Sequence, residues 1–442
     1  MAVLLRRGFV DWTTPPYPFA NGSQYHGPMR FCIHRGTHEI GGTCVEIEAQ
    51  GKRIVLDIGL PLDVAEPDAM ALHPVPGFDK PDPSLLGVVI SHPHQDHYGL
   101  AYRLPPQTTF LIGPAAQSIL EAADLFTPAG LKLQNVIHMA HRRPIELGPF
   151  TITPYLVDHS AYDAYAVLVE ADGKRLFCSG DFGAHGRKAK LVEELIENPP
   201  QDVDVLLMEG TTLGRPETEQ GFPTEEELVP KFVDLFEQTE GLVLVWASGQ
   251  NIDRLVTLYK ACRRAKRQLI LDVYTTHILR ATGNEHIPQA GWQDIRVFLP
   301  ASQRYRIIRD QAFELVNPLK PYRIYHENIA AEADRSVMLF RPSMIRDLNA
   351  IDELIIGRLI VSVWGGYLKD EKNQPLLDWL QRRSIPMDQC HTSGHAAADS
   401  LRLLREAFST ATVFPIHGEH PDRFHDWAGK AQLTVDGDWL TA

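Results

Sequence analysis

The chain has few cysteines and no long apolar run. Only 5 of its 442 residues are cysteines, and they are scattered without a paired spacing. This pattern predicts free thiols in a reducing compartment rather than a disulfide framework. No stretch is apolar enough over a sufficient length for a membrane span or a signal peptide. We therefore expect a cytoplasmic protein that does not contact a membrane.

Positive charge is also scarce. There are 56 acidic and 43 basic residues, so the net charge is −13, which argues against a uniformly basic surface for nucleic acid. Internal repeats, low-complexity tracts and long linkers are absent from the sequence. The chain length and a hydrophobic content of 44% suit two closely joined domains.

Histidine, in contrast, is concentrated in one short segment. Residues 91–97 read Ser-His-Pro-His-Gln-Asp-His and follow an apolar stretch that predicts a buried strand. His92 and His94 are two residues apart, so on an extended backbone they point to the same side and can bind one ion. Asp96 and His97 lie past the bend and can face a second ion. Zinc accepts both ligand types, and a hydrolytic zinc site keeps one position open for water.

Three later apolar runs end in residues of the same chemical kinds. Residues 151–157 lead to His159, residues 174–178 lead to Asp181, and residues 411–416 lead to His417. Taken alone, His159 could be an ordinary loop histidine and Asp181 a turn residue beside glycine. Their order behind the first cluster favours a shared metal site.

The residues His92, His94, Asp96 and His97 match the His-x-His-x-Asp-His motif, and the chain thereby resembles the metallo-β-lactamase superfamily. The resemblance implies an α/β fold, a four-layer αββα sandwich with two zinc ions (Zn²⁺) at one edge of the sheets. It implies that one ion is bound by His92, His94 and His159, and the other by Asp96, His97 and His417, with Asp181 bridging the two. Asp57 lies where the family often has a carboxylate that supports the first motif.

The stretch between Asp181 and His417 is much longer than a minimal superfamily member needs. It resembles the β-CASP branch, which includes ribonuclease J and the endonuclease of the polyadenylation machinery; Glu209, His395 and His417 match the acidic residue and the two histidines of that branch. The expected organisation is an irregular arm over 1–28, a first catalytic part over 29–210, a β-CASP insertion over 211–385 and a completing part over 386–442. Inside the insertion, a strand over 242–246 should lead into a helix with a basic last turn.

The branch implies a zinc-dependent nuclease. Phosphodiester hydrolysis needs a nucleophile, neutralisation of charge at phosphorus and a proton for the leaving oxygen. We expect hydroxide held by the two ions to attack phosphorus, with Asp96 essential to the second ion. His395 is predicted to supply the proton or contact the phosphate, because imidazole titrates near neutral pH; alternatively it caps a helix over 396–407. Glu209 is predicted to orient a metal ligand, or else is a simple strand-end carboxylate.

Single-stranded RNA is the expected partner. The candidate substrate contacts are Ser393 and Gly394, which directly precede His395, and His185, which follows Asp181 by four residues. Arg304 lies in a segment where Arg and Tyr alternate, which suits phosphate contact and base stacking but fits a solvated helix surface equally well. By resemblance, a histidine at 417 favours RNA, because DNA-directed relatives tend to have an aliphatic residue there.

Several alternatives remain open at this point. The same ions serve lactonases and thioesterases, DNA-directed nucleases share the fold, and an inactive binding subunit is a third class. Ribonuclease J usually has a Gly-Ser-Gln-Gly-Glu-Pro type segment in its insertion, whereas residues 361–368 here read Val-Ser-Val-Trp-Gly-Gly-Tyr-Leu. The sequence leaves open internal or 5′-end cleavage, and whether the chain forms a homo-oligomer or joins a multi-subunit assembly.

Overall fold

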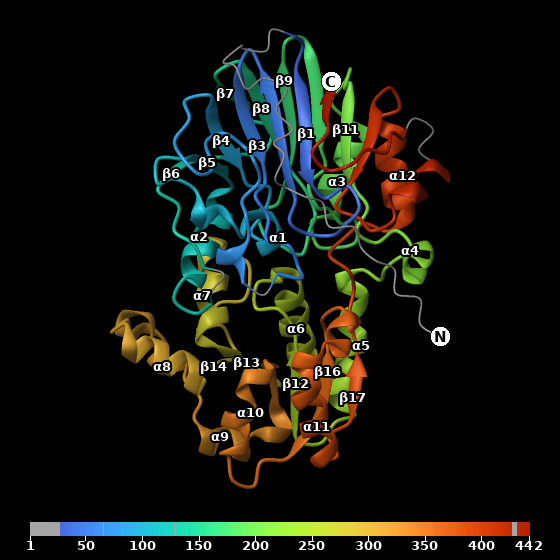
Figure 1. Ribbon diagram of the computed structural model, residues 1–442. Helices are drawn as coiled ribbons and strands as arrows, with labels where there is room; N and C mark the ends of the chain where they lie inside the picture. Colours follow the sequence, from blue (N-terminus) through green and yellow to red (C-terminus); the bar gives the residue numbers. More distant parts are fainter. Residues whose placement is uncertain (1–26, 65, 128–129, 427–430) are drawn as a thin grey trace, which may run out of the picture.

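The computed structural model describes residues 27–64, 66–127, 130–426 and 431–442. Two sheets form the upper part of the molecule in Figure 1 and a third sheet lies in the lower part. The arm predicted over 1–28 falls outside the described residues except for its last two positions.

The two upper sheets draw their strands from both ends of the chain. The seven-stranded sheet has the order β19 (Trp439–Thr441), β1 (Arg30–Arg35), β2 (Cys44–Ala49), β3 (Lys52–Leu56), β4 (Leu85–Val89), β5 (Thr109–Ile112), β6 (Asn135–His138). The six-stranded sheet has the order β18 (Thr412–Ile416), β11 (Val205–Glu209), β10 (Lys174–Cys178), β9 (Tyr165–Ala171), β8 (Phe150–Leu156), β7 (Ile145–Leu147). The strands predicted before each candidate ligand are therefore confirmed.

These sheets pack face to face with helices outside. Inward side chains such as Phe31, Ile54 and Phe150 form one buried cluster between them, because alternate residues of a strand point to the same face. Helix α2 (Pro114–Ala123) covers the outer face of the first sheet. Helices α3 (Ala189–Glu197) and α12 (Ala398–Ala407) cover that of the second. The predicted αββα sandwich is confirmed.

The lower part is built on a parallel sheet with the order β14 (Ile295–Phe298), β13 (Gln268–Asp272), β15 (Ser336–Phe340), β12 (Leu242–Trp246), β16 (Ile356–Val361), β17 (Met387–Gln389). Its strands are almost continuously apolar, as expected for a parallel sheet covered on both faces. All of them fall between residues 242 and 389, inside or just beyond the predicted insertion; the exact domain boundaries remain predictions.

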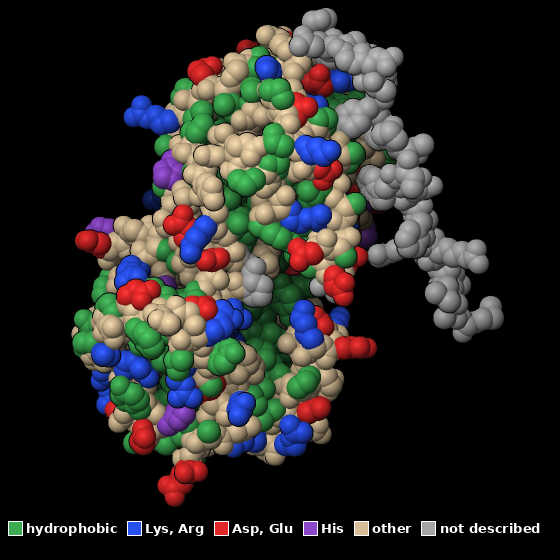
Figure 2. Space-filling model, turned by 60° about the vertical axis from the view of Figure 1, so that its left-hand side comes forward, with side chains coloured by type: hydrophobic (Ala, Val, Ile, Leu, Met, Phe, Trp, Pro, Cys, Tyr) green, Lys and Arg blue, Asp and Glu red, His purple; other side chains and the backbone are tan. Residues whose placement is uncertain are grey.

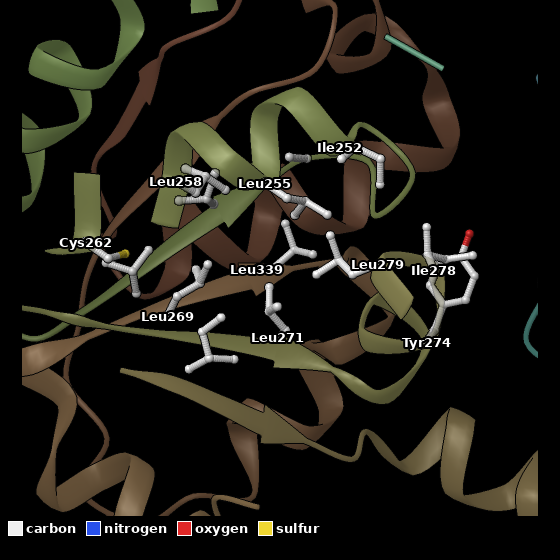
Figure 3. Close-up of a cluster of buried hydrophobic side chains, with 14 of the residues drawn as sticks. Ile252, Leu255, Leu258, Cys262, Leu269, Leu271, Tyr274, Ile278, Leu279 and Leu339 are labelled. Atoms are coloured by element: carbon white, nitrogen blue, oxygen red, sulfur yellow. The ribbon is translucent and has the colours of Figure 1, made fainter. Parts of the chain in front are cut away.

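Helix α6 (Ile252–Arg264) shows how the lower part folds locally. The Asn251 side chain caps its first turn by accepting from the Arg254 backbone N–H, and Leu255, Leu258 and Cys262 follow at helical spacing. Figure 3 shows these side chains packed against β13 and helix α7 (Val273–Ala281). The predicted strand and helix are confirmed here.

The upper and lower parts share one core. Apolar side chains of α2, which belongs to the upper sandwich, join the buried cluster that contains Tyr274 and Ile278 of α7. The contact between α2 and α7 fixes the two parts side by side at their junction (Figure 1). They are joined by packing rather than tethered.

The remaining helices are short and mostly belong to the lower part. They are α1 (Gln95–Tyr98), α4 (Pro216–Gln220), α5 (Glu225–Glu237), α8 (Ala301–Arg309), α9 (His326–Ala331), α10 (Ile345–Asn349) and α11 (Gln374–Arg382). Among the described residues, no helix has the length and apolarity that crossing a membrane would require. On the face shown in Figure 2, Lys and Arg side chains are interspersed with Asp and Glu.

Candidate metal centre

The predicted ligands meet at the junction of the two parts. Each one follows the carboxyl end of a strand: β4 leads to the 91–97 segment, β8 to His159, β10 to Asp181 and β18 to His417. Strands β10, β11 and β18 are parallel neighbours, so their carboxyl ends lie at the same edge of the sheet. The fold thus collects residues that are far apart in sequence.

Three compact groups of ligand atoms result, and the ligand atoms inside each group lie within 4.8 Å of one another. His92, His94 and His159 form the first group, and Asp96, His97, Asp181 and His417 form the second. A third group, His159, Asp181 and His395, overlaps both. Asp181 lies between the first two groups: its Oδ2 is 3.8 Å from Nε2 of His92, and its Oδ1 is 3.1 Å from Nδ1 of His417. All seven predicted ligands are brought together in the two sets that the resemblance implied.

Outer hydrogen bonds orient the imidazole rings. Nδ1 of His97 donates to Asp57 Oδ2 at 2.7 Å, and Asp57 also accepts from the Ser91 backbone N–H at 2.7 Å. Nδ1 of His159 donates to the carbonyl of Gly394 at 2.8 Å, which leaves Nε2 of His159 to face the group. Such contacts fix the ring tautomer and its direction, as around bound metals. Asp57 holds this position at φ 59°, in the left-handed region.

The donor set fits divalent metal ions. Among the side chains that the structure describes, Nε2 of His92 and Nε2 of His417 are buried nitrogens without a hydrogen-bond partner. A buried polar atom left unpaired costs free energy, and a cation between the groups would satisfy both. Imidazole nitrogens with carboxylate oxygens are ligands that suit zinc.

Burial and charge set the protonation states that such ligands need. Burial lowers the pKa of His92 and His159 well below the ordinary value, and lowers that of His94 to about 4, so these rings are neutral at pH 7. Burial alone would raise the pKa of Asp181, but the neighbouring histidines, His417 foremost, hold it well below its ordinary value. Burial opposes protonation of His97 as well, but the carboxylates around it, Asp181 foremost, outweigh burial and raise its pKa well above the ordinary value. The centre therefore offers three neutral imidazoles and an ionised carboxylate, beside a protonated His97 whose proton a bound metal would displace.

His395 lies beside the ligands with one face open. Its Nδ1 donates to Glu209 Oε2 at 3.0 Å and is 3.7 Å from Asp181 Oδ2, while 21% of its side chain is exposed. Burial opposes its protonation, but the carboxylates of Glu209 and Asp181 outweigh burial and raise its pKa to about 8. It is thus a cationic group aimed at the metal centre at neutral pH.

The structure excludes one alternative for His395 and gives Glu209 its partners. Helix α12 begins at Ala398 and its N-cap is Ala397, with no side-chain cap, so His395 does not cap it. The structure places Glu209 against His395 and the backbone N–H of Phe182, which donates to Oε1 at 2.7 Å. Its main partner is therefore the candidate proton donor rather than one of the seven ligands.

The remaining predicted contacts divide into two kinds. Ser393 and Gly394 lie in the loop before His395: the Ser393 carbonyl accepts from Nε2 of His185 at 2.7 Å, and the Ser393 hydroxyl accepts from the His395 N–H at 3.0 Å. Ser393 therefore contacts both His185 and His395, and the Gly394 carbonyl contacts the His159 ring. Arg304 is exposed on α8, a helix whose Arg306 donates to the Leu125 carbonyl just after α2 at 3.3 Å, and Arg304 is not among the residues that form the ligand groups.

One residue at the junction was not predicted to matter. Arg254, at the start of α6, is completely buried and donates to Glu225 at 2.9 Å, to the Ser362 carbonyl at 2.9 Å and to the Thr392 carbonyl at 3.4 Å. It connects α5, the end of β16 and the loop that carries His395. An arginine in the first turn of an amphipathic helix gives no sequence signal for such a role.

Comparison with known proteins agrees with this geometry. Residues 52–234 match the family model described as a β-lactamase superfamily domain. This segment is similar to that superfamily and contains six of the seven candidate ligands. The chain is 24% identical over 417 residues to ribonuclease J of Helicobacter pylori, covering 87% of this chain and 55% of that protein. Ribonuclease J of Mycoplasma genitalium is 22% identical, covering 89% of this chain and 68% of that protein.

Two further similar proteins extend the comparison. An RNase J-like protein of Methanocaldococcus jannaschii is 20% identical, covering 79% of this chain and 77% of its own length. The crystal structure of a protein of unknown function from Enterococcus faecalis superimposes with a TM-score of 0.75 at 19% identity, covering 94% of this chain and all of that one. The chain spans only about half the length of the Helicobacter relative. The shared fold includes the upper and lower parts together.

Proposed function

We propose that this chain is a phosphodiester hydrolase that cleaves RNA with two zinc ions. The observation that supports it most directly is the pair of ligand groups around Asp181, in which two buried nitrogens without a hydrogen-bond partner would bind a cation. Ribonuclease J relatives that match 87% and 89% of the chain support RNA as the substrate. His92, His94 and His159 would hold one ion, and Asp96, His97, Asp181 and His417 the other.

The chain's own residues would then perform the remaining steps. Bound zinc supplies charge neutralisation at the phosphate and acidifies water toward neutral pH. His395, protonated below about pH 8, donates a hydrogen bond to a phosphate oxygen or a proton to the leaving oxygen. Glu209 keeps Nδ1 of His395 occupied, so that Nε2 carries the transferable proton. Asp57 and Gly394 hold the His97 and His159 rings in place.

The test is cleavage of matched single-stranded RNA and DNA oligonucleotides labelled at either end. Zinc-loaded wild type should yield RNA fragments, and Asp96→Ala should yield none while remaining folded. The label that appears in the first short product distinguishes internal from 5′-end cleavage. Cleavage of DNA alone would make DNA the substrate in place of RNA. Cleavage of neither polymer would favour a lactone or thioester substrate.

A second variant separates the proton donor from the ligands. His395→Ala should lower RNA cleavage by roughly 10²–10⁴-fold, the range for a lost general acid, and leave bound zinc close to two ions per chain. His138→Ala is a matched control, because His138 is an exposed histidine whose Nε2 bonds to the Gln117 side chain at 2.7 Å and which belongs to none of the ligand groups. Loss of zinc in His395→Ala would instead make His395 a ligand.

A further inference from the structure

An exposed cluster of one arginine and two aromatic rings lies at the junction of the two parts. Trp364 and Tyr367 are 52% and 47% exposed, and their ring centroids lie 5.9 Å apart in an edge-to-face arrangement. The guanidinium carbon of Arg215 is 5.0 Å from the Trp364 ring centroid. We refer to Arg215, Trp364 and Tyr367 as the Arg–aromatic cluster.

Arg215 connects this cluster to the catalytic side. It follows β11, whose last residue is Glu209, the partner of His395. Its backbone N–H donates to the Thr212 carbonyl at 3.1 Å, and the Thr212 hydroxyl donates to the Ala396 carbonyl at 2.6 Å. Thr212 therefore links the backbone of Arg215 to the segment that carries His395.

The two rings come from the other part of the molecule. They lie in the loop after β16, in the segment where the sequence departs from the usual ribonuclease J pattern. The contact between Trp364 and Arg215 places these rings against the segment that follows β11, whose last residue, Glu209, pairs with His395.

The loop that presents the rings is fixed in place. A Cβ added at Gly366 would lie 2.3 Å from the indole of Trp364, so only glycine allows this close packing. The Tyr367 carbonyl accepts from the Asn373 side chain at 2.9 Å, and Ser362 at the base of the loop is bound by Arg254. Rings that are already ordered lose little conformational entropy when a ligand binds.

We propose that the Arg–aromatic cluster is a stacking platform for one nucleobase of single-stranded RNA close to the cleaved phosphate. The proposal rests on the proposed nuclease function and deepens it. Every base has a π-face, so exposed aromatic rings bind single strands with little sequence preference, and arginine adds cation–π attraction. A platform of this kind explains how a chain with a net charge of −13 can hold RNA without a broad basic surface.

The experiment compares intact RNA with oligonucleotides that contain a single abasic nucleotide at successive positions. For wild type, removing the base that occupies the platform should raise KM about 5- to 20-fold, the lower part of the range for one base–aromatic stack, with kcat little changed. For Trp364→Ala, KM for intact RNA should rise by a similar factor and the position-specific effect of the abasic site should disappear. Tyr367→Ala, a smaller change to the loop, should reproduce part of both effects.

Tyr325→Ala is the matched control. Tyr325 is 51% exposed and has the Arg323 guanidinium 4.9 Å from its ring centroid, but it lies next to α9 at the bottom of the lower part (Figure 1). Its KM should equal that of wild type. If RNA is cleaved but no abasic position raises KM, or if Trp364→Ala shows the same position-specific effect as wild type, the platform proposal is wrong. The nuclease proposal then still stands. Absence of RNA cleavage by wild type overturns the nuclease proposal first, and the platform with it.

Discussion

Replacing Arg254 by methionine should destabilise the junction strongly. Arg254 is completely buried, its partner Glu225 is 4% exposed, and the guanidinium also donates to the carbonyls of Ser362 and Thr392. Methionine fills similar space but donates nothing, so it leaves a buried carboxylate and two carbonyls without this donor. Removing one partner of a buried ion pair costs about 3–5 kcal/mol in the free energy of unfolding.

A control on the same helix separates burial from charge. Arg263, near the end of α6, pairs with Asp294, and both side chains are more than one third exposed. Exposed pairs contribute only about 0–1 kcal/mol, so Arg263→Met should change stability little. Adding Glu225→Gln to Arg254→Met should recover part of the loss, because the remaining partner is then uncharged.

The assay is equilibrium urea unfolding followed by tryptophan fluorescence and by circular dichroism, at one fixed zinc concentration because bound metal adds to stability. At a permissive temperature, Arg254→Met should also lower kcat for RNA, since Thr392 is three residues before His395 in sequence. If Arg254→Met and Arg263→Met lose equal stability, the interpretation of Arg254 as the buried link between the two parts is wrong.

Three further predictions concern the centre itself. The His395 pKa of about 8 lies above its ordinary value, so the protonated, active form is lost as pH rises through 8; Glu209→Gln should move this alkaline limb of the kcat profile to lower pH, and an unmoved limb would remove Glu209 from the argument. Gly394→Ala should reduce zinc content and activity, because its Cβ would lie 2.4 Å from the Ser160 hydroxyl oxygen, and adding Ser160→Gly should restore both if the clash is the cause. Asp57→Asn should weaken zinc binding about 10- to 100-fold, measured by competition with a chelator; unchanged affinity would show that the His97 ring needs no carboxylate behind it.

Much of the fold and of the centre was predictable because the information is local. Apolar runs at strand length, each followed by His or Asp, indicated both the β-strands and the edge where their ends meet. The seven candidate ligands were found in this way, while their division into two sets came from the family resemblance; the structure brings their ligand atoms close together. Helical spacing of Leu255, Leu258 and Cys262 predicted α6 in the same manner.

Local pattern failed where the contact spans the chain. The alternation of Arg and Tyr around Arg304 does not reveal where α8 packs. The sequence alone therefore could not tell whether Arg304 lies beside the metal centre. The hydrogen bond between Glu209 and His395 joins residues 186 positions apart, and nothing in either segment specifies the other. The sequence indicated both residues but not that they contact each other.

The sequence by itself determined which side chains are available for metal chemistry, because ligand type and strand-end position are properties of short segments. Only the tertiary structure decided which ligand atoms lie close enough together to bind one cation. It also decided which carboxylate pairs with His395, and which aromatic rings lie beside Arg215. Those relations depend on how β11, β16 and β18 are placed in two different sheets. That placement results from the packing of the whole core, which no single stretch of sequence specifies.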